Sequence, residues 1–143
     1  MTRIDALERE GKTIAVLFAD TKFVGIIASR DEARTDSKLA IAALTALGIK
    51  SLMLSGDNQR TATAVAAPLG MEAEGELMPA DKLDRIAALK AEIPILMVGD
   101  GVNDAPALAT ASLGLAMGGG TDVAIETADV GLLRDRLLAV PDA

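Results

Sequence analysis

Residues 94–106 read PILMVGDGVNDAP. The apolar run at 94–98 is typical of a buried strand, and two carboxylates, Asp100 and Asp104, follow it beside glycines that allow the backbone to turn sharply. Two like charges at a strand end cost free energy unless a cation or hydrogen bonds compensate them. Because Mg²⁺ prefers carboxylate oxygens, the stretch predicts a magnesium site, with a purely structural turn as the alternative interpretation.

On both sides of this stretch, strand-like and helix-like patterns alternate. Helices are predicted over 35–47, 58–69, 81–91, 105–110 and 123–127, and strands over 50–54, 75–77, 94–98, 113–117 and 130–133. Strands separated by helices of this length favour right-handed crossovers and a largely parallel sheet, so the fold class is α/β. Earlier in the chain, the β-rich runs 13–19 and 23–28 flank a polar turn and predict a hairpin.

The composition excludes several kinds of chemistry. The 143 residues include no cysteine and no histidine, which excludes disulfides, zinc sites built on thiolate or imidazole, cysteine nucleophiles and a histidine base. The net charge of −7 argues against nucleic acid or anionic lipid as the main partner, because both attract basic surfaces. Neither a signal peptide nor a run of about 20 apolar residues is visible, so we expect a cytoplasmic domain without a membrane span.

Two further polar clusters lie at predicted element boundaries. Ser55-Gly56-Asp57-Asn58 follows a strand and opens a helix, where a hydroxyl and free N–H groups favour a phosphate site, although Ser and Asp also serve as ordinary caps. Lys82 lies in the first turn of another predicted helix, where a lysine is ordinarily exposed to solvent. A functional role requires its ammonium group to reach over the sheet end and neutralise a phosphoryl oxygen.

Taken together, Ser55-Gly56-Asp57, Lys82 and residues 99–108 (GDGVNDAPAL) resemble the phosphorylation domain of P-type ATPases, which belongs to the haloacid dehalogenase superfamily. Residues 118–129 (GGGTDVAIETAD) resemble the next segment of that domain in these pumps, and the heavy-metal-transporting branch is the most similar. The resemblance runs from about residue 13 to residue 133. It implies a three-layer, Rossmann-like α/β fold with a largely parallel sheet.

The resemblance also implies a role for each matching residue on the phosphoryl side of the site. Ser55 would bind the phosphoryl group through its hydroxyl, where threonine is more usual, and Gly56 would offer its backbone N–H. Lys82 would stabilise the phosphoryl charge. These roles agree with the demands of phosphoryl transfer, which needs positioning and electrostatic stabilisation from the protein.

On the metal side, the resemblance implies Mg²⁺ as the cofactor. Asp100 would be its ligand. Asn103 and Asp104 would complete the network around metal and phosphate, with Asn103 on the phosphate and Asp104 among the catalytic residues.

One motif of the family is absent: these residues contain no Asp-Lys-Thr-Gly-Thr, whose aspartate is the nucleophile of the pumps. We therefore expect residues 1–12 to be a remnant that precedes the domain and 13–143 to be its C-terminal portion. In the superfamily the nucleophile strand lies centrally, between the strands that end at Leu54 and Val98. Without it those strands would expose unpaired edges. They could pair directly, recruit the hairpin, or pair with a second polypeptide.

Three functions are compatible with these observations. The first is a truncated phosphorylation domain of a metal-cation pump that binds Mg²⁺ and a phosphoryl group but lacks the nucleophile. The second is a small Mg²⁺-dependent phosphatase that uses Asp20, although Lys22 stands where the superfamily has Asp or Thr, so Asp20 is better interpreted as a turn residue. The third is a non-catalytic module that completes a missing half-domain, associates with a pump, or self-associates.

Overall fold

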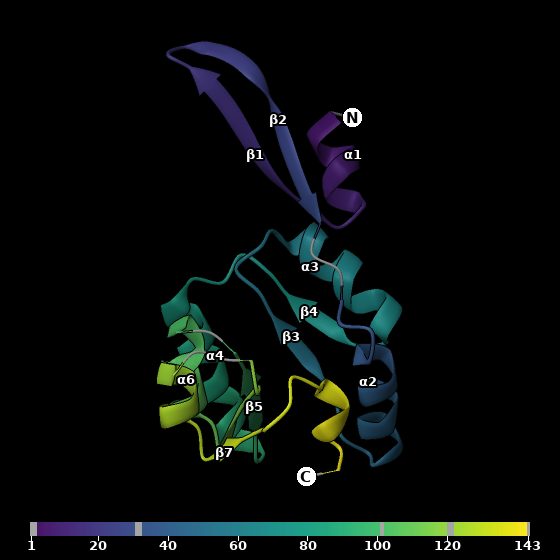
Figure 1. Cartoon of the computed structure of the whole chain (residues 1–143), viewed down its shortest axis with the longest axis vertical. Helices are drawn as coiled ribbons and strands as arrows, with labels where there is room; N and C mark the ends of the chain where they lie inside the picture. Colours follow the sequence, from purple (N-terminus) through teal and green to yellow (C-terminus); the bar gives the residue numbers. More distant parts are fainter. Residues whose placement is uncertain (1–2, 31–32, 101, 120–121, 143) are drawn as a thin grey trace. The chain divides into compact units, whose positions relative to one another are not determined.

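The computed structural model describes residues 3–30, 33–100, 102–119 and 122–142. The chain divides into two compact units, Met1–Glu76 and Leu77–Ala143. Figure 1 shows the course of the chain through both of them.

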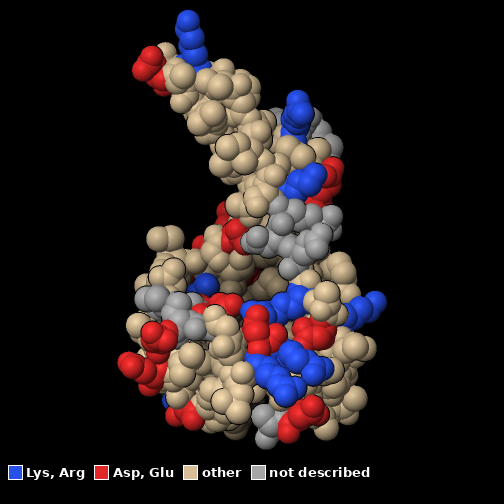
Figure 2. All heavy atoms as spheres, viewed as in Figure 1, with Lys and Arg blue, Asp and Glu red and all other residues tan. Residues whose placement is uncertain are grey.

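The first unit begins with helix α1 (Arg3–Arg9) and a β-hairpin. Strands β1 (Lys12–Ala19) and β2 (Lys22–Arg30) are antiparallel, as predicted, with a bulge between Leu17 and Phe18. The rings of Phe18 and Phe23 pack edge to face with their centroids 6.2 Å apart. Figure 2 shows that most of the hairpin surface in this view is uncharged and that charged side chains gather near its tip.

The rest of the first unit is a two-stranded parallel sheet with helices. It contains α2 (Ser37–Ala46), β3 (Leu52–Leu54), α3 (Gln59–Ala66), the 3₁₀ turn η1 (Ala67–Leu69) and β4 (Glu72–Glu74). Gly70 ends the second helical segment with φ 77°, the left-handed conformation that glycine adopts without strain.

The strand predicted at 75–77 is wrong, because the chain has already left the sheet there. A Cβ on Gly75 would lie 2.7 Å from the Cα of Gln59 and 2.9 Å from the carbonyl oxygen of Asp57. Glu76 has φ 59° and donates its backbone N–H to that same carbonyl. The glycine therefore marks a close turn, and the strand lies three residues earlier, at Glu72–Glu74.

The second unit is a three-stranded parallel sheet in the order β5-β6-β7, with helices packed against it. Its elements are α4 (Pro79–Glu92), β5 (Leu96–Gly99), η2 (Val102–Asp104), α5 (Ala105–Thr110), β6 (Leu113–Ala116), α6 (Asp122–Thr127), β7 (Val130–Gly131) and η3 (Leu137–Ala139). Fully buried Leu108, Ala116 and Ala124 form the centre of its core. Met97 and Ala128 pack around them.

The expected fold class, α/β with parallel sheets, is confirmed. Within the described ranges, β3 pairs with β4 and β5 pairs with β6, so direct pairing of β3 with β5 is not observed. Among the described residues, the hairpin forms a sheet of its own, and neither β3 nor β5 pairs with it. In the part of the chain that the structure describes, we find no helix whose length and apolar character would let it span a membrane.

Candidate functional site

The Ser55–Asn58 loop joins β3 to α3 and belongs to the first unit. The backbone N–H of Ser55 donates to the carbonyl of Glu74 in β4, which holds the start of the loop on the sheet. Asn58 is the N-cap of α3: its Oδ1 accepts from the backbone N–H of Thr61 at 2.9 Å. The loop is thus fixed at both ends, with exposed Gly56 between them.

Ser55 and Asp57 bond to each other inside this loop. The Ser55 hydroxyl donates to Asp57 Oδ2 at 3.1 Å and accepts from the Asp57 backbone N–H at 3.1 Å. A hydroxyl and backbone N–H groups gathered ahead of a helix N-terminus can together bind an anion. This matches the local arrangement that the sequence predicts for Ser55 and Gly56, while their role toward phosphate stays a prediction.

Side chains of α1 contact the first turn of α3, next to this loop, and the sequence did not indicate that contact. Arg60, in α3, contacts Asp5 Oδ1 at 2.7 Å and Glu8 Oε2 at 3.1 Å. The hydrogen bond with Asp5 and the charges of both carboxylates raise the pKa of the Arg60 guanidinium. The sequence shows that Asp5 and Glu8 lie about one helical turn apart, but acidic residues at this spacing are too common to predict a specific contact.

In the second unit, Lys82 lies close to Asp104. The Lys82 Nζ and the Asp104 Oδ1 are 3.8 Å apart, and both side chains are only 21 % exposed. Lys82 is therefore not an ordinary exposed lysine. Asp81, by contrast, supports the start of α4, since its Oδ2 accepts from the backbone N–H of the N-cap residue Met78 at 2.9 Å.

The packing of α4 against α5 brings Lys82 and Asp104 together. At the far end of α4, the Lys90 Nζ donates to the carbonyls of Thr110 and Ala111 at 2.9 and 3.0 Å, which ties α4 to the C-terminal end of α5. Asp104 is the N-cap of α5, at its other end. The two helices are therefore held together where α5 ends, and the Lys82–Asp104 pair lies where it begins.

Asp100 and Asn103 complete the group at the carboxyl end of β5. Asp100 directly follows β5 and Asn103 lies in η2, and both are exposed. A Cβ on Gly99 would lie 2.8 Å from the Cβ of Asp104, so the glycine allows the Asp104 side chain to approach the strand end. The parallel sheet thus carries its acidic residues where α/β proteins bind ligands.

The donor set fits Mg²⁺ if other oxygen ligands complete the shell. Asp100, Asn103 and Asp104 offer only hard oxygen ligands, and no group of three or more acidic, histidine or cysteine residues able to hold a metal occurs in the described ranges. Mg²⁺ is usually bound through one or two carboxylates together with water and substrate phosphate oxygens. The carboxylates of Asp100 and Asp104 are of the kind that this mode of binding uses.

Asp20 lies in the turn of the hairpin. It is exposed and has φ 54°, a left-handed conformation that Asp tolerates in turns. In the part of the chain that the structure describes, the strand before it pairs with β2 alone, in an antiparallel sheet. Asp20 therefore does not follow a strand of either parallel sheet, as a nucleophile of the superfamily would.

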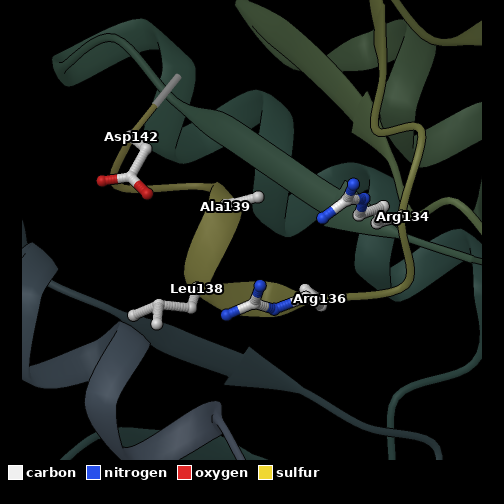
Figure 3. Close-up of a pocket in the computed structure, with 5 residues that line it drawn as sticks. All are labelled: Arg134, Arg136, Leu138, Ala139 and Asp142. Atoms are coloured by element: carbon white, nitrogen blue, oxygen red, sulfur yellow. The ribbon is translucent and has the colours of Figure 1, made fainter.

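A pocket that the sequence did not predict lies near the C-terminus. It has a volume of about 170 Å³ and is lined by Arg134, Arg136, Leu138, Ala139 and Asp142 (Figure 3). Both arginines and Asp142 are exposed. Its lining includes none of the predicted site residues.

The comparisons with known proteins agree with this geometry. Residues 1–112 match the family described as haloacid dehalogenase-like hydrolase. The chain is 46 % identical over 134 residues to a zinc/cadmium/lead-transporting P-type ATPase of Escherichia coli (strain K12), with 94 % of this chain and 18 % of the relative covered. It is 50 % identical over 145 residues to a probable cadmium-transporting ATPase of Staphylococcus aureus (strain MRSA252), with 99 % and 20 % covered. The chain thus spans about a fifth of the length of these relatives.

Many solved structures are similar to the chain, and two of them illustrate the likeness. One is a zinc-transporting PIB-type ATPase in the E2.Pi state, with a TM-score of 0.82 and 45 % identity over 97 % of this chain and 23 % of that protein. The other is the catalytic domain of the CPx-ATPase CopB-B, with a TM-score of 0.71 and 30 % identity over 92 % of this chain and 57 % of that domain. Both cover almost all of the chain.

Proposed function

The chain belongs to the haloacid dehalogenase-like hydrolases, and from that premise we propose that it acts as part of the cytoplasmic phosphorylation domain of a metal-cation-transporting P-type ATPase. Its task is to bind a phosphoryl group and Mg²⁺ during aspartyl-phosphate chemistry. The observation that supports this most directly is the Lys82–Asp104 pair, 3.8 Å apart and largely shielded from solvent. The metal cations named for the relatives indicate the class of cargo.

The residues of the chain contribute positioning and charge. Lys82 neutralises a phosphoryl oxygen, and the shielding of its ammonium group from water strengthens that attraction. In the first unit, the proposed role of the Ser55 hydroxyl and the Gly56 N–H is to donate to phosphoryl oxygens. In the second unit, exposed Asn103 is the proposed amide donor to phosphate. Phosphoryl transfer depends mainly on contacts of this kind.

Asp100 is the proposed metal ligand, with Asp104 beside it. When bound there, Mg²⁺ would offset negative charge on the phosphoryl oxygens. Asp104 would contribute negative charge to such a site while it also pairs with Lys82. We infer that Lys82 and Asp104 keep each other in place until substrate arrives.

These 143 residues contain no Asp-Lys-Thr-Gly-Thr motif, so we propose that the aspartate that carries the phosphoryl group comes from another polypeptide segment of a pump. The exposed, turn-bound Asp20 supports this inference, since it does not follow a parallel strand. The alternative is an independent phosphatase that uses Asp20, and it predicts turnover by the chain alone.

Two measurements on the purified chain test the proposal. Mg²⁺-dependent hydrolysis of p-nitrophenyl phosphate is compared for the parent, Asp20→Asn and Asp100→Asn, and the expected result is no turnover in any of them. Binding of inorganic phosphate with Mg²⁺ is followed by NMR for the parent and Lys82→Met. A lost charge-assisted hydrogen bond should weaken binding about ten- to a hundred-fold. Lys38→Met, an exposed lysine in α2, is the matched control.

The outcomes separate the functions. Turnover that disappears in both Asp20→Asn and Asp100→Asn would establish an independent phosphatase and overturn the proposal. Phosphate binding that is equal in the parent, Lys82→Met and Lys38→Met would remove Lys82 from the site.

A further inference from the structure

The segment of α1 and β1 contacts the Ser55–Asn58 loop and the start of α3 through side chains far apart in sequence. The Thr13 hydroxyl donates to Asp57 Oδ1 at 3.2 Å, and the Asn58 Nδ2 donates to Glu8 Oε1 at 3.0 Å. We propose that Thr13 and Glu8 are positioning residues that hold this loop in the conformation that receives a phosphoryl group. This inference rests on the proposed function and extends it to residues outside the motifs of the site.

Thr13 and Glu8 lie on either side of a buried turn between α1 and β1. Gly11 is buried there with φ 73°, and a Cβ on it would lie 3.5 Å from the Ala64 Cβ in α3. The hydroxyl of buried Thr61 donates to the Lys12 carbonyl at 3.3 Å. Thr13 and Glu8 therefore project from backbone that is itself packed against α3.

Glu8 fixes the amide of the helix cap. Its Oε1 accepts from the Asn58 Nδ2, and its Oε2 accepts from Arg60 at 3.1 Å. The Glu8 side chain is only 18 % exposed, so water competes weakly for these oxygens. With one end of its amide bound to Glu8, Asn58 presents Oδ1 to the Thr61 N–H and caps α3.

Thr13 acts on the carboxylate that bonds to Ser55, the residue proposed to bind phosphate. In this structure, Asp57 accepts from Ser55 at Oδ2 and from Thr13 at Oδ1. When the Ser55 hydroxyl donates to a phosphoryl oxygen instead, Asp57 loses that partner, because a hydroxyl has a single hydrogen to donate. Thr13 then keeps the carboxylate from turning toward the phosphate, whose like charge would oppose binding.

The test compares Thr13→Val with Thr13→Ser. Valine removes the hydroxyl from a strand position that suits a β-branched residue, whereas serine retains it. We expect Thr13→Val to weaken the binding of inorganic phosphate with Mg²⁺ about three- to ten-fold and Thr13→Ser to restore most of it. Thr45→Val is the matched control, because the Thr45 hydroxyl bonds within α2 to the Ile41 carbonyl.

A second readout does not need phosphate. Amide hydrogen exchange of Asp57, whose backbone N–H donates to the Ser55 hydroxyl, is measured without added phosphate. This amide should exchange about three- to ten-fold faster in Thr13→Val than in Thr45→Val, because a loop that has lost one hydrogen bond opens more often. Glu8→Ala should accelerate exchange of the Thr61 amide, which the Asn58 cap protects.

The two readouts distinguish the failure of this inference from that of the proposed function. If the parent does not bind phosphate but amide exchange is faster in Thr13→Val, the proposed function fails. Thr13 then orders the loop without any role in phosphate binding. If the parent binds phosphate and Thr13→Val matches Thr45→Val in both readouts, the positioning role is wrong.

Discussion

The Lys82 ammonium lies 3.8 Å from the Asp104 carboxylate, and each side chain is 21 % exposed. The pair joins the first turn of α4 to the N-cap of α5, the helix that follows β5 and η2. Because both groups are mostly shielded from water, the attraction between them is stronger than in a surface ion pair.

A double-mutant cycle with Lys82→Met and Asp104→Asn should give a coupling free energy of about 0.5–1 kcal/mol in urea denaturation. The Lys12–Glu10 pair, with side chains 28 % and 57 % exposed, is the control cycle and should couple less strongly. Salt at about 1 M should reduce both couplings. Equal coupling in the two cycles would contradict the shielding argument.

Leu108 should be the most sensitive position of the second unit. Its side chain is 0 % exposed and is a central member of the core with Ala116 and Ala124. Leu108→Ala should lower the free energy of unfolding by about 3–5 kcal/mol, since it leaves a cavity. Leu133→Ala, at a fully exposed leucine, should change it by less than about 0.5 kcal/mol. Urea denaturation measures both, and similar values would show that Leu108 does not carry the core.

Local sequence patterns predicted most of the helices and strands, because the formation of these elements depends largely on residues that are close in sequence. The apolar run before Asp100 became β5, and Gly70 ended its helical segment with a left-handed φ. The strand predicted at 75–77 failed because Gly75 is required by a contact with Gln59, sixteen residues away. No pattern within residues 75–77 records that contact.

For the candidate site too, features set by neighbouring residues were predicted and contacts between distant residues were not. The sequence indicated which residues follow the strands, since a strand end is a local feature. It did not indicate that α1 would reach the loop ahead of α3, because that contact depends on Glu8 meeting Asn58 fifty residues later. Nor could it establish that Lys82 faces Asp104, which results from the packing of α4 on α5.

Replacement by alanine should change the stability of the chain differently at two glycines. A Cβ on Gly114, in β6, would lie 2.6 Å from the Leu108 carbonyl oxygen, a backbone atom that cannot move away without shifting α5. Gly114→Ala should therefore destabilise the chain by about 1–3 kcal/mol. Gly25, in β2, has nothing within 4 Å of its Cβ position, so Gly25→Ala should be neutral or slightly stabilising. Thermal unfolding monitored by circular dichroism compares them, and a harmless Gly114→Ala would mean that α5 is not tightly packed on β6.

The hairpin should make the chain prone to self-association. Phe18, Phe23 and Ile27 are 58 %, 59 % and 61 % exposed, and both outer edges of the hairpin lack a paired strand among the described residues. Exposed apolar strands with open edges are common sites of association. Ile27→Thr keeps a β-branched side chain while removing apolar surface, so it should reduce association at high concentration and change the free energy of unfolding by less than about 0.5 kcal/mol.

Sedimentation velocity over a range of chain concentrations measures this effect. Leu133→Thr is the control, because Leu133 is fully exposed but lies outside the hairpin. If Ile27→Thr shifts the chain toward monomer and Leu133→Thr does not, the association depends on the hairpin surface. If both variants shift it equally, total exposed apolar area is responsible, and the open edges of β1 and β2 have no special part in it.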